Sequence, residues 1–173
     1  MSSKREKFYT LCKKLWTAGS AAALATAFFI SGSQFTSVAH AQETWDGENY
    51  KYESVNDITL NGKVIDGSTA FIQSSKNVSV TNNSNIKADY GYLYATDSLS
   101  INHSNIIQTY TGIVDGSTLT IENQGLVRQG LGGRITGQTW AKINNASVQQ
   151  GTGGLIEAIL KDLTIENGQV HEV

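Results

Sequence analysis

The sequence predicts an all-β protein, a single-stranded parallel β-helix of about six coils of 20–22 residues preceded by a helical signal peptide. Three observations predict this solenoid. A pattern of apolar, polar, apolar and asparagine residues recurs along the 173-residue chain, with its clearest copy at residues 119–127. The copies begin at positions 58, 78, 99, 119, 141 and 163, so their steps are 20, 21, 20, 22 and 22 residues. The chain also contains no proline, which would remove a backbone donor from a strand.

Each copy has the pattern of a short strand, a corner and a second strand. In residues 119–121 two apolar side chains flank a threonine, which is the period of a half-buried strand. Asparagine follows, and it tolerates the left-handed backbone conformation that a bend requires. A glycine later in the repeat, such as Gly91 or Gly112, predicts a second corner and a third strand. Three strands and three corners make one coil, which pairs with its neighbours at a spacing of about 4.8 Å.

Asparagine recurs at the first corner of every coil. Stacked side-chain amides can hydrogen bond from coil to coil, so we expect an asparagine ladder. Independent turn residues are the alternative interpretation. The expected members are Asn61, Asn82, Asn102, Asn123, Asn145 (or its neighbour Asn144) and Asn167.

Residues 1–41 have the pattern of a cleavable signal peptide. Five lysine and arginine residues lie near the start, and an apolar run follows at residues 21–30. Small residues then precede the expected cleavage site between Ala41 and Gln42. A membrane anchor is the alternative, but the run is shorter than the about 20 residues that span a bilayer. The only cysteine, Cys12, precedes the run, so the expected mature chain has none, as suits bacterial export.

The repeats define the expected domain organisation. Residues 42–57 break the pattern and contain the bulky Trp45, Tyr50 and Tyr52, so we expect an N-terminal cap or an irregular first coil there. Residues 58–173 form the solenoid. The last repeat is followed by no charged or aromatic cap, so we expect a truncated C-terminal end. Unpaired strand edges at that end can self-associate.

Composition limits the function. The expected mature chain has eight Lys or Arg and fourteen Asp or Glu, a formal charge of −6, which argues against nucleic acid as a partner. No spacing predicts a metal site or a cofactor. The acidic residues are scattered and suit turns. Only Asp97 and Asp115, in neighbouring coils, could form the carboxylate pair of a glycoside hydrolase. A non-enzymatic protein is therefore predicted.

Four tyrosines are candidate binding residues. Tyr90, Tyr92 and Tyr94 alternate with smaller residues, so a strand places all three on one face. Tyr110 is expected one coil further along, beside Tyr90. An exposed aromatic strip can bind sugars or protein surfaces. Tyrosines that only stabilise the sheet by cross-strand packing are the alternative.

The basic signal, the cysteine-free mature chain and the coils rich in Asn, Gly, Ser and Thr resemble the N-terminal passenger region of bacterial autotransporters of the pertactin-like and adhesin class. The resemblance covers nearly the whole chain. It implies a virulence-associated adhesin exported to the cell surface, outer membrane or extracellular space of a Gram-negative bacterium. Its implied partners are a host surface protein or glycan and an outer-membrane β-barrel, which this sequence lacks. The alternatives are a carbohydrate-active β-helix enzyme (polysaccharide lyase or hydrolase) or its remnant, and a self-assembling extracellular fibre subunit.

Overall fold

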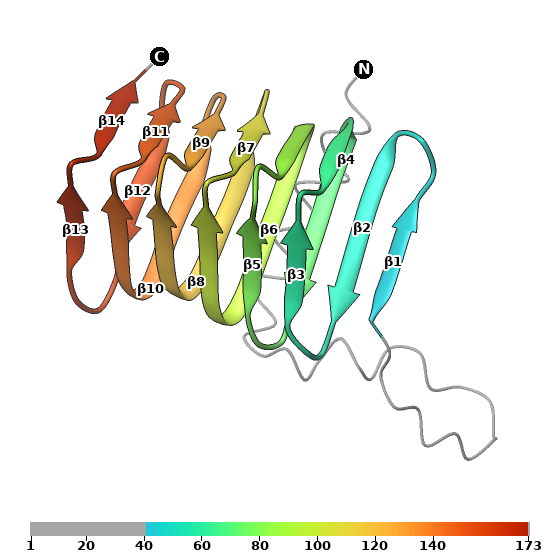
Figure 1. The fold of residues 1–173 in the computed structure, drawn as a ribbon. Coiled ribbons are helices and arrows are strands. Elements are labelled where there is room, and N and C mark those ends of the chain that lie inside the picture. The colour runs from blue at the N-terminus through green and yellow to red at the C-terminus, as the bar shows by residue number, and fades with distance from the viewer. Residues whose placement is uncertain (1–40, 173) are drawn as a thin grey trace. The chain divides into compact units, whose positions relative to one another are not determined.

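Pairing between successive repeats builds a parallel β-helix. The computed structural model describes residues 41–172. Fourteen β-strands, joined by corners, form about six coils stacked along one axis (Figure 1). The predicted all-β fold, a parallel β-helix, is therefore confirmed. The helical signal peptide is predicted over residues 1–41, and residues 1–40 of it lie outside the described residues.

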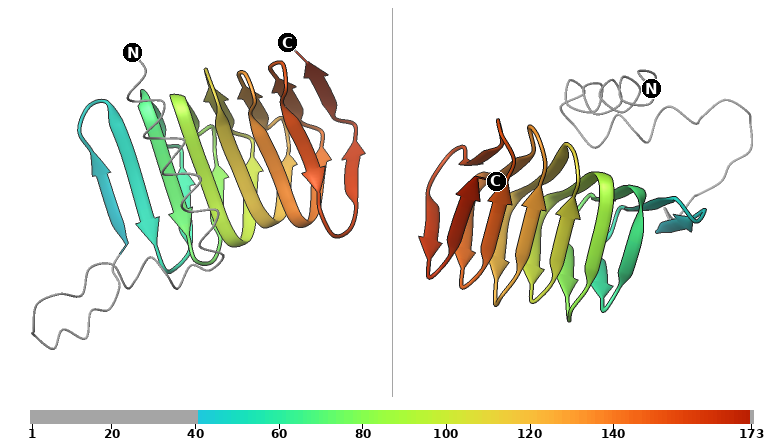
Figure 2. Two further views of the ribbon diagram at one scale, coloured as in Figure 1. Left: turned by 180° about the vertical axis from the view of Figure 1, so that it is seen from behind. Right: turned by 90° about the horizontal axis from the view of Figure 1, so that it is seen from above.

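All strands except the first form three parallel stacks, here called the first, second and third faces (Figure 2). The first face contains β3 (Ile58–Asn61), β5 (Val78–Thr81), β13 (Leu163–Glu166) and the C-terminal parts of β6 (Asn85–Asn102), β8 (Gly112–Glu122) and β10 (Arg134–Asn144). The second face contains β7 (Asn105–Gln108), β9 (Leu126–Gln129), β11 (Ser147–Gln150), β14 (Gln169–Glu172) and the N-terminal parts of β4 (Val64–Ser74) and β6. The third face contains β2 (Asn49–Ser54), β12 (Leu155–Ala158), the C-terminal part of β4, the middle of β6 and the N-terminal parts of β8 and β10.

The apolar positions of the repeat stack in register and form the core. Two rows of inward side chains run along the first face, one from each apolar position of the strand. The first row is Ile58, Val78, Leu99, Leu119, Ala141 and Leu163. The second row is Leu60, Val80, Ile101, Ile121, Ile143 and Ile165. All members except those of β13 are buried, so each coil covers the core of the next.

The first corner bends through a left-handed residue in every coil. The residue after the first-face strand has a φ between 49° and 61°. The residues at this position are Gly62, Asn82, His103, Asn123, Asn145 and Asn167. Glycine and asparagine adopt this conformation at little cost, which explains why the repeat carries them there. A small buried residue follows, as Ser84 and Ser104 do, because little space is left inside the corner.

The second corner contains a buried row of glutamines that sequence reasoning did not identify. Gln108, Gln129 and Gln150 occupy equivalent positions on the second face and are all buried. Gln129 Nε2 donates a hydrogen bond to Gln108 Oε1 over 2.6 Å. A Cβ atom at Gly112 would overlap the Gln108 amide, and one at Gly133 would lie 2.6 Å from the Gln129 Cβ atom. The glycines of the repeat therefore make room for the glutamines.

An antiparallel hairpin lies at the N-terminal end of the solenoid. β1 (Gln42–Trp45) pairs with β2, and Tyr50 of β2 is part of the hydrophobic core. The Tyr50 hydroxyl donates a hydrogen bond to Glu43 Oε1 over 3.0 Å. Lys63 forms an ion pair with the same carboxylate, and its Nζ atom lies 5.5 Å from the Tyr50 ring centroid. The segment expected to be a cap thus places a large aromatic ring at this end of the core.

Candidate functional site

The outward side chains of the third face form two parallel rows along the solenoid. The first row is Lys51, Phe71, Tyr92, Ile113, Arg134 and Leu155. The second row is Glu53, Gln73, Tyr94, Asp115, Thr136 and Glu157. Aromatic side chains therefore lie over β4 and β6. Over β8, β10 and β12 the side chains are polar or charged, except Ile113 and Leu155.

The predicted tyrosines form two pairs, one on the third face (Tyr92 and Tyr94) and one between Tyr90 of β6 and Tyr110 in the corner before β8. Tyr92 and Tyr94 have ring centroids 6.0 Å apart, and Tyr90 and Tyr110 have centroids 5.4 Å apart. Phe71, which the sequence analysis did not include, stacks on Tyr92 with centroids 4.9 Å apart and planes 13° from parallel. Its position opposite Tyr92, about one repeat earlier, is the signal that could have identified it. We call these five residues the aromatic strip.

The rings of the aromatic strip stabilise the sheet and remain partly exposed. The contact between Phe71 and Tyr92 uses one face of each ring and stabilises the pairing of β4 with β6. Tyr110 remains 48% exposed, and Tyr90, Tyr92 and Tyr94 are half-buried. The strip is therefore accessible from solvent while its packing holds the rings in a fixed arrangement.

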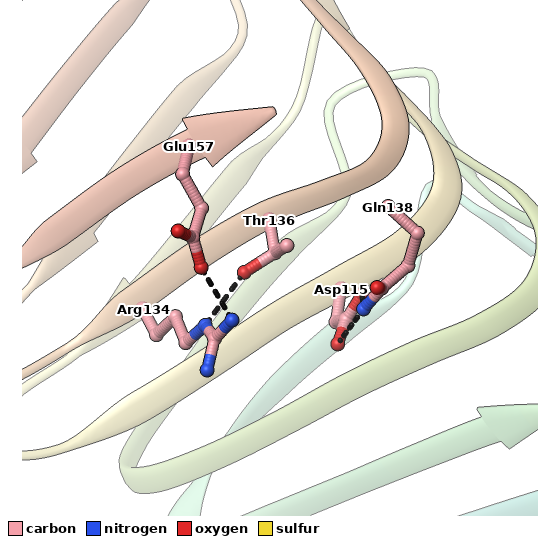
Figure 3. Close-up of polar contacts among 5 residues, drawn as sticks. All are labelled: Asp115, Arg134, Thr136, Gln138 and Glu157. Atoms are coloured by element: carbon pink, nitrogen blue, oxygen red, sulfur yellow. Dashed lines mark hydrogen bonds and ion pairs between the residues drawn. The ribbon is translucent and has the colours of Figure 1, made fainter. Parts of the chain in front are cut away.

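A group of hydrogen-bonded polar residues continues the third face beyond the aromatic strip (Figure 3). Arg134 donates from Nε to Thr136 Oγ1 over 2.8 Å and from Nη2 to the Glu157 carboxylate. Gln138 Nε2 donates to both carboxylate oxygens of Asp115, over 2.9 and 3.0 Å. We call these five residues the polar cluster. Its members come from β8, β10 and β12, so three successive coils contribute to it.

Asp115 is an unusual carboxylate for a protein surface. It lies on the outward row of the third face but is only 8% exposed. Burial raises the pKa of Asp115, while the hydrogen bond from Gln138 and the charge of Arg134 partly oppose this rise. Thr136 lies between Asp115 and Glu157 in the same row, so the two acidic residues are separated by two strand spacings, about 10 Å between backbones. Asp97, the partner that repeat spacing suggests for Asp115, is exposed.

The predicted ladder asparagines occupy two adjacent positions of the first corner. Asn61 and Asn102 end their strands, whereas Asn82, Asn123, Asn145 and Asn167 are the left-handed residues that follow the strands.

Hydrogen bonds join two pairs of these asparagines. Asn82 Nδ2 donates to Asn61 Oδ1 over 2.8 Å, and Asn123 Nδ2 donates to Asn102 Oδ1 over 3.3 Å. Asn102 Nδ2 also donates to Glu122 Oε1 over 2.9 Å, so a carboxylate takes part in the same stack.

The remaining candidate chemistry is limited. In residues 41–172 no group of three or more His, Cys, Asp and Glu side chains is placed to hold a metal ion. Over the same residues, the structure has no helix long and apolar enough to cross a membrane. His103 lies exposed at a left-handed corner, as an ordinary turn residue does.

The fold defines the protein as a parallel β-helix with an aromatic and polar third face. Comparison with known proteins adds no narrower class, because no family model, curated protein or solved structure matches the chain.

Proposed function

We propose that this protein is an exported, non-enzymatic β-helix that binds a neutral glycan through the aromatic strip and the adjoining polar cluster, in the manner of an adhesin-like passenger. The signal-peptide pattern of residues 1–41 and the cysteine-free chain that follows support export from a Gram-negative bacterium to its surface or surroundings. The observation that carries the binding proposal is the half-exposed aromatic strip beside fixed hydrogen-bonding groups.

The chemistry of the third face suits a sugar. Aromatic rings contact the apolar faces of sugar rings, and nearby amide, hydroxyl and carboxylate groups can bond to sugar hydroxyls. In the polar cluster, the partly exposed Gln138 supplies an amide and the partly exposed Glu157 and Arg134 supply charged groups, whereas Thr136 and Asp115 are buried. The expected mature charge of −6 opposes a polyanionic ligand, so the glycan we propose is uncharged.

Binding to neutral oligosaccharides, first on an array and then by calorimetry, tests this proposal. Tyr92→Ala and Tyr94→Ala should each weaken binding about fivefold or more, because truncation of a central aromatic contact commonly costs over about 1 kcal/mol. Trp140→Ala is the matched control, since Trp140 is a partly exposed aromatic residue on the first face and should bind like the unchanged protein. Circular dichroism should show that every variant keeps its strands.

The proposal fails if no neutral glycan binds, or if Trp140→Ala weakens binding as much as the tyrosine variants. If the chain binds a protein instead of a glycan, and the tyrosine variants weaken that binding, then the aromatic strip remains the binding site but its ligand is a protein.

A carbohydrate-active enzyme is the second candidate, and the buried Asp115 favours it. A carboxylic acid with a raised pKa can donate a proton to a glycosidic oxygen, and a second carboxylate about 6.5–9.5 Å away can activate water. Glu157 lies in the same row, two strands from Asp115. Because the acid acts in its protonated form, such activity should fall as pH rises through the Asp115 pKa.

Release of reducing ends from neutral polysaccharides tests this candidate. Activity that is lost in Asp115→Asn and in Glu157→Gln would establish it, and Asp97→Asn is the matched control because Asp97 is exposed. If the unchanged protein releases no reducing ends from a glycan that it binds, the enzyme candidate is excluded and the binding proposal stands.

A further inference from the structure

The two polar atoms of the Gln138 side-chain amide have different surroundings. Nε2 donates to both carboxylate oxygens of Asp115, over 2.9 and 3.0 Å, as Figure 3 shows. Within residues 41–172 the other atom, Oε1, accepts no hydrogen bond, and it is not buried. The nitrogen of this amide is therefore held by the protein, whereas its carbonyl oxygen is left for a ligand.

The charge of Asp115 determines which end of the amide faces it. An ionised carboxylate only accepts hydrogen bonds, so it can bond to the amide nitrogen but not to the carbonyl oxygen. Asp115 is only 8% exposed, so little water reaches the carboxylate to replace Gln138. A protonated carboxyl carries a hydroxyl donor, which can bond to Gln138 Oε1 after the amide turns over. Ionised Asp115 thus fixes the amide in one of its two orientations.

Three strands place groups around the Asp115 carboxyl. Burial raises the pKa of this carboxyl above the ordinary value of 3.8. The charge of Arg134 on β10 opposes this rise, and the charge of Glu157 on β12 adds to it. The neighbours in the same row are Tyr94 on β6 and Thr136 on β10. The carboxyl therefore ionises, and orients the amide, as pH rises through a value above 3.8.

We propose that Asp115 is a positioning residue and Gln138 a specificity-determining residue of the third face, because the ionised carboxylate leaves the Gln138 carbonyl oxygen to face the ligand. The site then requires a ligand that donates a hydrogen bond to this oxygen, as a sugar hydroxyl does. A site built to bond one hydroxyl discriminates strongly against an analogue that lacks it. This inference rests on the proposed glycan binding and adds which chemical group of the glycan is recognised.

Calorimetry with the neutral oligosaccharide that binds most tightly on the array, and with its mono-O-methyl and monodeoxy derivatives, tests this selection. Methylation removes the proton of one hydroxyl but keeps its oxygen, and the deoxy derivative adds no bulk. At one position of the oligosaccharide both changes should weaken binding at neutral pH about threefold or more. Gln138→Met removes the amide but keeps a side chain of similar length. This variant should bind the parent oligosaccharide less tightly and should no longer discriminate against those two derivatives.

The pH profile of binding tests the role of Asp115. Affinity should be highest where Asp115 is ionised and should fall about threefold or more as pH falls through its pKa, with a midpoint above 3.8. Asp115→Asn has no carboxyl to titrate, so its affinity should stay constant over the same range. Asp97→Asn is the matched control, because Asp97 is an exposed carboxylate of β6, and it should keep the profile of the unchanged protein.

Nuclear magnetic resonance of the free protein separates this inference from glycan binding. The side-chain amide resonances of Gln138, assigned by their absence in Gln138→Met, should shift with pH at the midpoint seen in binding. Asp115→Asn should abolish this shift. These resonances and the sugar derivatives are measured on the unchanged protein, so they decide the question even where a variant does not fold.

The outcomes distinguish the two proposals. If no neutral glycan binds, the proposed function is wrong and the selection by Gln138 falls with it. If a glycan binds but the Gln138 resonances do not shift with pH, only the positioning role of Asp115 and the selection that depends on it are overturned. The same holds if no methylated derivative binds more weakly than the parent oligosaccharide, or if Asp115→Asn keeps the pH profile.

Discussion

Position 112 requires a glycine because a side chain of the same repeat fills the space beside it. The Gln108 amide occupies the space that a Cβ atom at position 112 would need. The same amide accepts the hydrogen bond from Gln129, so the glycine also protects a buried contact between coils. The spacing recurs, because Gln129 precedes Gly133 and Gln150 precedes Gly154 by the same four positions.

Gly112→Ala should lower the free energy of unfolding by about 1–3 kcal/mol, the usual cost of leaving a buried polar group without its partner. Urea denaturation followed by circular dichroism measures the loss. When Gln108 is already alanine, no amide occupies the space of the new Cβ atom at position 112. In that background Gly112→Ala should therefore lower the free energy of unfolding much less. Equal costs in both backgrounds would show that the contact between Gly112 and Gln108 has no energetic role.

The corner asparagines occupy two neighbouring positions, one that needs a left-handed backbone and one that accepts a side-chain hydrogen bond. The left-handed conformation selects Asn82, Asn123, Asn145 and Asn167, while Asn61 and Asn102 accept hydrogen bonds from the left-handed residues of adjoining coils. At the strand-end position, Glu122 and Glu166 replace asparagine, and Glu166 pairs instead with Lys142. Backbone conformation and side-chain pairing therefore both shape this corner.

Among the elements, the β1 hairpin depends on a small charged network. Glu43 of β1 accepts a hydrogen bond from the Tyr50 hydroxyl and forms an ion pair with Lys63. The hydrogen bond from Lys63 lowers the pKa of Glu43, with a smaller contribution from Tyr50 that acts in the same direction. Burial, in turn, raises the pKa of Tyr50. The hairpin is thus held in place by one carboxylate that contacts two other segments.

Glu43→Gln should lower the stability of the solenoid at neutral pH and change its dependence on pH. Because the Glu43 pKa is lower in the folded state, its contribution is fully present above the unfolded value of 4.5 and is lost as pH falls through the folded value. The two proteins should therefore become equally stable in acid. Urea denaturation from neutral to acidic pH measures this convergence.

Glu53→Gln is the control for this network. Glu53 forms an exposed ion pair with Lys51 over 2.6 Å within the same strand, and such surface pairs usually contribute less than about 1 kcal/mol. A larger loss in Glu53→Gln than in Glu43→Gln would contradict the role assigned to Glu43.

At the scale of the whole solenoid, stability comes from contacts between adjacent coils. Each inner coil buries its two first-face rows against its neighbours, and β6 pairs with strands of both adjoining coils. A single coil cannot bury these side chains by itself. Tyr50 of β2 extends the core at the hairpin end of the solenoid.

The sequence by itself determined the solenoid. A period near 21 residues repeats the apolar pairs and the corner asparagines, and identical short segments stack best in register. The position of the aromatic strip was also predictable, because alternation along one strand places Tyr90, Tyr92 and Tyr94 on the same side.

Only the tertiary structure decided which side chains of adjacent coils contact one another. The burial of Asp115, its two hydrogen bonds from Gln138 and its place in a row with Glu157 depend on the register between coils. Stacking of Phe71 on Tyr92 and of Gln129 on Gln108 depends on it as well. The coil length varies by up to two residues, so sequence spacing alone does not say which side chains become neighbours. Backbone pairing fixes that register, and the surroundings of each side chain follow from it.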